Sequence, residues 1–104
     1  MSWKIRYFES VEVWLDQLDS HRLKAVAKEL RLLELCGNNL RLPHSRSLGQ
    51  GLFELREKRY GLRLYYVFQK NKTICLLHAG GKSAQIKDIV IAKTRQLRLG
   101  RGVK

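Results

Sequence analysis

The sequence predicts an α+β domain, in which an N-terminal strand and a helical hairpin pack on a small antiparallel meander sheet and a C-terminal helix completes the fold. Two patterns carry this prediction. Apolar residues recur at helical spacing in residues 10–36 and 84–99, and they alternate between short turns in residues 45–79. With 104 residues, 44% of them hydrophobic, the chain suits one core. We expect one domain over residues 1–104, with a flexible basic tail at about 100–104.

The first forty residues predict a strand followed by two helices. Trp3–Phe8 alternates with the period of a strand. Ser10 is expected to cap a short helix that stops near Asp19, and Ser20 is expected to cap a longer helix with an apolar stripe. Gly37 and the two asparagines after it supply the left-handed conformations that end a helix. Two such helices need a sheet on which to bury their stripes.

Four strands are expected next, and the short turns between them force antiparallel pairing. Alternation places Arg56 of one strand and Arg63 of its neighbour on the face opposite the apolar one. After Gly80–Gly81 the helical spacing returns. The expected strands are residues 45–48, 52–56, 62–69 and 73–79. In the third of these, Leu62, Leu64, Tyr66 and Phe68 are expected to point inward, and Arg63, Tyr65, Val67 and Gln69 outward.

The positive charge of the chain is confined to its second part. Lys and Arg number 21 against 9 Asp and Glu, a net charge of +12. Residues 1–40 hold six side chains of each sign, so residues 41–104 carry the whole excess, with 15 cations against 3 carboxylates. Segregation of this kind points to a polyanionic partner, and RNA or DNA is the commonest one.

Several classes of protein are disfavoured by the sequence. No apolar run reaches the roughly 18–20 residues of a membrane span, and no signal peptide is evident, so we expect a cytoplasmic protein without a membrane partner. Cys36 and Cys75 form no metal or redox motif and are expected to be buried free thiols. His21, His44 and His78 lie at unrelated spacings, so we expect no metal and no cofactor.

A cluster of cations is therefore the candidate site. Arg56 and Arg63 lie on neighbouring strands, Lys82 follows the end of the next strand, and Arg46 precedes them. If these four converge, they form a site for a phosphate diester, and Tyr65 is placed to stack on a base. Cleavage of RNA without a metal needs an aligned 2′-OH, a proton acceptor, and cations that stabilise the phosphorane.

The proton acceptor is the least defined part of this site. A lysine whose pKa is lowered by neighbouring cations would serve, and so would His78. Each role has a structural alternative. Arg56 and Arg63 are equally well read as solvated sheet residues, and His78 as a histidine of the core.

Four segments in a fixed order carry a resemblance to a known family. Their sequences are VWLDQL at 13–18, SLGQGLFELR at 47–56, GLRLYY at 61–66 and LLHAGGKSAQ at 76–85, the last leading to Asp88, Ile89 and Ala92. Together they resemble the bacterial RelE/ParE toxin superfamily over Phe8–Leu97, and in particular its HigB-like branch of addiction-module killer proteins.

This resemblance implies the RelE-like fold and a ribosome-dependent mRNA endoribonuclease that enters the ribosomal A site and inhibits translation. It implies catalytic roles for Arg56, Arg63 and Lys82, which match basic positions of the family. The chain departs from the family at Glu54, where some relatives have lysine, and at Ser83, where some have a second basic residue. The further residues expected to bind substrate or rRNA are Arg46, Lys58, Arg59, Tyr65, Gln85 and Lys87.

The resemblance also implies a cognate antitoxin, a helix-turn-helix DNA-binding protein, beside ribosome and mRNA. Acidic antitoxin residues are expected to face the basic part of the chain. Trp3, Trp14 or the helical hairpin would supply apolar anchors, unless both tryptophans belong to the core. Two alternatives stay open: a non-enzymatic ParE-like gyrase inhibitor, against which the basic residues argue, and a catalytically inactive RNA-binding relative.

Overall fold

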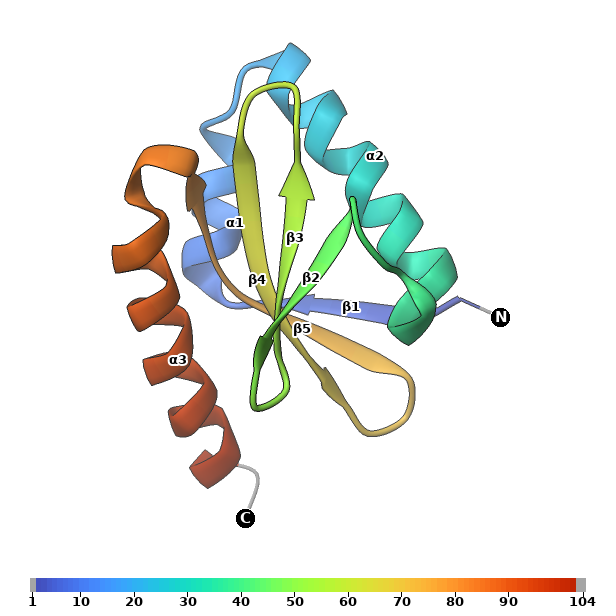
Figure 1. Ribbon diagram of the computed structural model, residues 1–104, viewed down its shortest axis with the longest axis vertical. Coiled ribbons are helices and arrows are strands. Elements are labelled where there is room, and N and C mark those ends of the chain that lie inside the picture. The colour runs from blue at the N-terminus through green and yellow to red at the C-terminus, as the bar shows by residue number, and fades with distance from the viewer. Residues whose placement is uncertain (1, 103–104) are drawn as a thin grey trace.

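A computed structural model of the chain describes residues 2–102, which form a five-stranded sheet with three α-helices (Figure 1). The strand order across the sheet is β1-β5-β4-β3-β2. The α+β class predicted from the sequence is confirmed. In chain order the elements are β1 (Lys4–Tyr7), α1 (Glu9–Asp16), α2 (Ser20–Cys36), the 3-10 turn η1 (Gly37–Asn39), β2 (Ser45–Gly49), β3 (Leu52–Glu57), β4 (Leu62–Gln69), β5 (Thr73–Gly81), the 3-10 turn η2 (Lys82–Ala84) and α3 (Gln85–Gly102).

The sheet is mixed rather than wholly antiparallel. Strands β2 to β5 form the expected antiparallel meander. At its edge β1 pairs with β5 in parallel, from Lys4 opposite Thr73 to Tyr7 opposite Leu76. A parallel pair cannot be joined by a tight turn, and here β1 and β5 are separated by both N-terminal helices and three strands. Local periodicity carries no information about such a distant partner.

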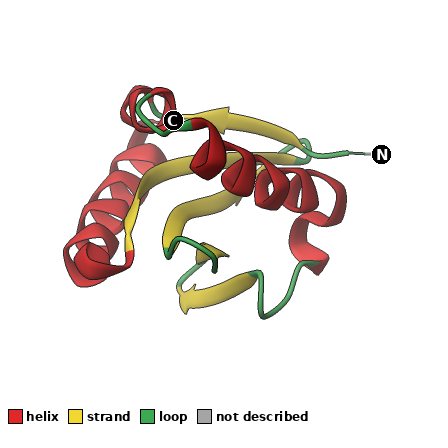
Figure 2. Ribbon diagram, turned by 90° about the horizontal axis from the view of Figure 1, so that it is seen from above, coloured by secondary structure: helices red, strands yellow, loops and turns green. Residues whose placement is uncertain are grey.

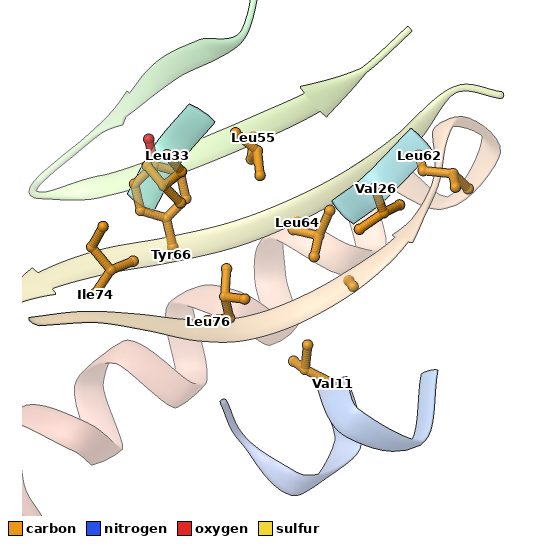
Figure 3. Packing of buried hydrophobic residues seen from close by; sticks show 10 residues of the cluster. Val11, Val26, Leu33, Leu55, Leu62, Leu64, Tyr66, Ile74 and Leu76 are labelled. Atoms are coloured by element: carbon orange, nitrogen blue, oxygen red, sulfur yellow. The ribbon is translucent and has the colours of Figure 1, made fainter. Parts of the chain in front are cut away.

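Helices cover both faces of the sheet (Figures 1 and 2). On one face, Val11 of α1 and Val26 and Leu33 of α2 pack against the strands (Figure 3). On the other face, Ala92 of α3 packs against Tyr65 and its neighbours. With both faces covered, β4 is buried along Leu62–Val67.

This arrangement corrects the expectation that one side of β4 points outward. Arg63, Tyr65 and Val67 lie on the face that alternation assigned to them, but α3 covers that face and buries all three side chains. Gln69 is half-buried. The pattern of residues within a strand gives the face, and it does not reveal a helix that arrives from elsewhere to cover it.

Both N-terminal helices begin earlier than expected from their serines, α1 by two residues and α2 by one. Phe8 occupies the N-cap position of α1, so Ser10 lies in its first turn. The cap of α2 is Asp19 rather than Ser20, and its carboxylate accepts the main-chain N–H three residues later at 2.8 Å. That hydrogen bond lowers the pKa of Asp19 below its usual value.

Both tryptophans pack against the hydrophobic cluster between the sheet and the helices α1 and α2, and neither is exposed. Trp3 and Trp14 are partly buried there, which leaves neither as a free anchor. The Trp3 indole also explains Gly37, which ends α2 with φ of +53°. A Cβ at this position would lie 2.0 Å from the indole nitrogen, so only glycine fits.

At the C-terminal end, α3 runs through Gly100 to Gly102, beyond its expected end near Leu99. Most of the expected tail is therefore helical in backbone, and residues 103–104 lie outside the described part of the chain.

Both cysteines are free thiols, but only Cys75 is buried, and its burial raises the pKa of the thiol. Cys36 is half-buried. Within residues 2–102, no helix has the length and apolar character needed to cross a membrane.

Candidate functional site: a carboxylate-centred cluster of cations

The three residues expected to be catalytic meet at one end of the sheet. Arg56 of β3 is the direct cross-strand partner of Arg63 of β4, and Arg63 in turn faces Gly80 of β5. Lys82 follows β5 by one residue and lies beside the β3–β4 turn, where a Cβ on Gly61 would approach the Lys82 Cβ to 3.3 Å. Three successive strands thus bring together cations that are far apart in the sequence.

A buried carboxylate holds this cluster together. Glu54 is fully buried, and its Oε1 accepts a hydrogen bond from Arg63 Nη1 at 2.9 Å. The same oxygen lies 3.9 Å from Arg56 Nε, and Oε2 accepts the Gln85 amide N–H at 2.8 Å. Glu54 therefore ties β3, β4 and the start of α3 together. In the sequence Glu54 stands out only as a departure from the family pattern, although alternation places it on the face of Arg56.

The two arginines carry more positive charge than the carboxylate between them offsets. Like charges directly opposite each other in a sheet repel, and one carboxylate offsets only one of the two cations. The Nε atoms of both Arg56 and Arg63 are buried, and neither has a hydrogen-bond partner among the described residues. Their burial keeps these Nε atoms from an arriving ligand, but guanidinium groups match the oxygens of a phosphate, and the Arg56 side chain is partly exposed. The arrangement therefore suits an anion.

The two arginines differ in access. Arg63 is only 8% exposed, whereas the Arg56 side chain is 30% exposed. An arriving anion can therefore contact Arg56 more readily than Arg63, which lies deeper in the cluster.

His78 belongs to a separate hydrogen-bond network beside this cluster. Its Nε2 lies 2.7 Å from Asp88 Oδ1, and its Nδ1 lies 3.1 Å from Arg95 Nη1. A guanidinium group can only donate, so Nδ1 accepts and Nε2–H donates to Asp88. Arg95 also donates to the Leu77 carbonyl and the Ser10 hydroxyl. Both ring nitrogens are occupied, which favours a structural role for His78 in fastening α3 to β5 and α1.

Tyr65 does not stand where a base could stack on it. The side chain is fully buried under α3, with its ring stacked on the His78 ring at a centroid distance of 6.4 Å. Its hydroxyl is buried without a hydrogen-bond partner among the described residues. Desolvation, reinforced by the carboxylates of Glu54 and Asp88, raises the pKa of Tyr65. The expected stacking role is incompatible with this burial.

A basic cleft of about 550 Å³ adjoins the cluster on the side of α2. Lys58 and Arg59 line it from the β3–β4 turn, Arg56 lines it from β3, and α2 contributes Lys24 and Lys28. Arg56 thus belongs to both the cluster and the cleft. Residues 1–40 are neutral as a whole, yet they add cations to this surface, a feature that the division of charge along the chain concealed.

Two of the three remaining expected binding residues, Arg46 and Gln85, lie next to Glu54 of the cluster. Arg46 is exposed on β2 as the cross-strand partner of Glu54. Gln85 is half-buried through its bond to Glu54, and Lys87 is exposed in the first turn of α3. Within the described residues, no group of three or more His, Cys, Asp and Glu side chains is placed to hold a metal ion.

By sequence, the chain matches a family model and a protein of similar length. The family model described as phage-derived protein Gp49-like (DUF891) matches residues 13–97. An uncharacterised protein of Haemophilus influenzae is 33% identical over 102 residues, which cover 96% of this chain and 99% of that protein.

Solved structures share the fold at low sequence identity. A mutant of the E. coli toxin RelE in its free state superposes with a TM-score of 0.71 at 16% identity, covering 91% of this chain and 98% of that one. A chain of the Mycobacterium tuberculosis toxin–antitoxin complex RelBE2 gives 0.60 at 21% identity, with coverages of 78% and 99%. A chain of the Pyrococcus horikoshii RelE–RelB complex gives 0.60 at 17%, with coverages of 79% and 97%.

Proposed function

The chain belongs to the Gp49-like family, a RelE/HigB-type toxin family of the RelE/ParE superfamily, and on that premise we propose that it is the toxin of a type II toxin–antitoxin pair. We propose further that it inhibits translation as an endoribonuclease acting on ribosome-bound mRNA. The observation that carries this second step is the cross-strand pair of Arg56 and Arg63, two cations that share the carboxylate of Glu54 beside a basic cleft.

The proposed reaction uses the nucleophile of the substrate itself. The ribose 2′-oxygen attacks the adjacent phosphorus as its proton passes to water, and the 5′-oxygen leaves with a proton taken from water, giving a 2′,3′-cyclic phosphate and a 5′-hydroxyl. Arg56 and Arg63 would bind the phosphorane oxygens, and Lys82 would add a third positive charge from the neighbouring strand end. Fixed cations of this kind stabilise the charge that develops on phosphorus.

Glu54 acts here as a positioning residue. Its contacts fix the Arg63 guanidinium and the Gln85 amide, so that Arg63 is held in place before a substrate arrives. The basic cleft with Lys58 and Arg59 then offers a path for the RNA backbone away from the reacting phosphate. Arg46, opposite Glu54 on the neighbouring strand, and Lys87, in the first turn of α3, are exposed and would add further cations for the RNA.

The proposed function includes a partner. Two of the similar solved structures are chains of toxin–antitoxin complexes. By this likeness we propose that a cognate antitoxin binds this chain and restrains it, and from the family resemblance of the sequence we propose that it is a helix-turn-helix DNA-binding protein. Ribosome and mRNA complete the set of proposed partners.

Primer extension on a reporter mRNA after brief expression tests this function. Wild-type protein should produce cuts within the coding sequence, and a matched purified reaction should require ribosomes. Arg56→Ala should remove the cuts. Arg63→Ala is the poorer choice, because it would leave Glu54 buried without its ion pair. Growth arrest with intact mRNA and damaged DNA would instead support gyrase inhibition, and RNA binding without scission would indicate an inactive relative.

A further inference from the structure

The outer face of α3 carries an apolar stripe that nothing in the described structure covers. Ile86 is 84% exposed, Val90 60% and Leu97 66%. Their spacings of four and eleven residues correspond to about one and three helical turns, so the three side chains lie in one row. The opposite side of α3 is the one that packs on the sheet, through Ala92 and Ile89. An exposed row of large aliphatic side chains typically marks an interaction site.

The charges beside this stripe have one sign. Lys87, Lys93 and Arg98 are exposed on α3, whereas its one carboxylate, Asp88, is buried against His78. Lys93 lies within the stripe, between Val90 and Leu97. A partner that covers the apolar row must therefore also meet several cations, and an acidic partner gains from each of them.

These two observations favour one kind of occupant. A second copy of this chain would oppose cations to cations and bring together two molecules of net charge +12, which disfavours self-association. An amphipathic helix with an apolar seam and glutamate or aspartate on its flanks matches both the row and the charges. We propose that α3 is the docking face for an acidic amphipathic helix of the antitoxin. This inference rests on the toxin function proposed above.

Hollows at both ends of the stripe suit such a helix. Near its end, Leu97 and Lys93 border a hollow of about 520 Å³ whose other wall includes Leu48 of β2 and Gln50 of the β2–β3 turn. Near its start, Ile86 and Lys82 border a second hollow of about 600 Å³. Side chains of a docked helix would enter the first hollow as anchors. At the second hollow the partner would lie beside Lys82 and Gln85, and so restrict access to the arginine cluster.

The test uses the protein encoded next to this chain, co-expressed with it, and measures the affinity of the purified pair by calorimetry. Ile86→Asp with Val90→Asp should weaken binding by about 100-fold or more, since it removes two apolar contacts and repels acidic side chains. Both substituted positions are exposed, and aspartate at Ile86, in the first turn of α3, is favourable for the helix dipole, so α3 should persist by circular dichroism. Val13→Asp is the matched control, because Val13 is 49% exposed on α1 and should leave the affinity unchanged.

The outcomes separate this inference from the toxin function. If the neighbouring protein binds wild type and the double variant equally, or if Val13→Asp weakens binding as strongly, docking on α3 is overturned and the toxin–antitoxin pairing stands. If the neighbouring protein does not bind wild type at all, the pairing itself fails. Phosphatidylglycerol vesicles test a lipid contact. If they bind wild type but not the double variant, while the neighbouring protein still binds the double variant, the stripe is a lipid contact and the inference is wrong.

Discussion

The two faces of the sheet bury different kinds of side chains. Beneath α1 and α2 the strands present an aromatic and aliphatic layer, in which the Phe68 ring lies 5.2 Å from Trp3, 5.2 Å from Phe53 and 5.6 Å from Tyr66. Beneath α3 the layer is apolar along part of the helix, but towards its start it holds Glu54 and Arg63 with their ion pair. One sheet therefore carries a conventional core on one side and a charged cluster on the other.

The apolar layer and the charged cluster are expected to serve different purposes, the first stability and the second function. Apolar burial stabilises a fold directly, whereas a buried ion pair often contributes no more than well-packed apolar residues of the same volume would. Two cations that share one carboxylate in such a place, with the Arg56 side chain partly exposed beside a basic cleft, point to an anionic ligand. The comparison predicts that substitutions on the two faces will separate effects on stability from effects on RNA cleavage.

The largest effect on stability is expected at the carboxylate. Glu54→Gln removes the charge that offsets the buried Arg63, and breaking a buried pair in this way costs about 3–5 kcal/mol of unfolding free energy. Urea denaturation measures the loss. Glu34→Gln is the control, because Glu34 pairs with an exposed arginine on α2 and should shift the unfolding free energy by less than about 1 kcal/mol. Equal stability of Glu54→Gln and wild type would show that the pair is dispensable.

A comparable loss of unfolding free energy is expected from a substitution on the apolar face, but with no effect on RNA cleavage by the folded protein. Leu64→Ala empties a fully buried position in the centre of β4 and should cost about 3 kcal/mol. At a temperature where the variant remains folded, its RNA cleavage per folded molecule should equal that of wild type. A fall in that specific activity beyond tenfold would mean that the two faces are not independent.

A smaller effect is expected where β5 meets α3. A Cβ on Gly80 would lie 2.1 Å from Asp88 Oδ2, so Gly80→Ala forces the carboxylate away from His78 and should cost about 1–3 kcal/mol. Gly81→Ala is a close control, since a Cβ there meets nothing within 4 Å and should change stability by less than about 0.5 kcal/mol. Thermal denaturation of the two variants side by side measures the difference, and similar melting temperatures would refute the packing argument.

Much of the fold could be predicted from the sequence because it depends on local periodicity. The bounds of β4 agree with the expected residues 62–69, and the face assigned to Arg56 and Arg63 is the one observed. Gly37 ends α2 as expected. Parallel pairing of β1 and burial of Tyr65 were missed, because each depends on a contact between segments that are distant in the chain.

The candidate site was predictable in part for the same reason. Alternation and strand order bring Arg56, Arg63 and Lys82 to one end of the sheet. The role of Glu54 at their centre could not be read from a departure in a motif, because it requires side-chain geometry across two strands and a helix. The contribution of α2 to the basic cleft likewise depends on tertiary packing, which a division of charge along the sequence cannot show.

The most direct test of the charged face is the initial rate of mRNA cleavage by Arg56→Ala and Arg31→Ala in a purified reaction with ribosomes. Both variants lose one cation, but Arg56 lies in the cluster and Arg31 is paired with Glu34 on the exposed side of α2. We expect Arg56→Ala to lower the rate about 100-fold or more, with the unfolding free energy changed by less than about 1 kcal/mol, and Arg31→Ala to retain the wild-type rate. Equal rates for the two variants would contradict a catalytic role for this cluster.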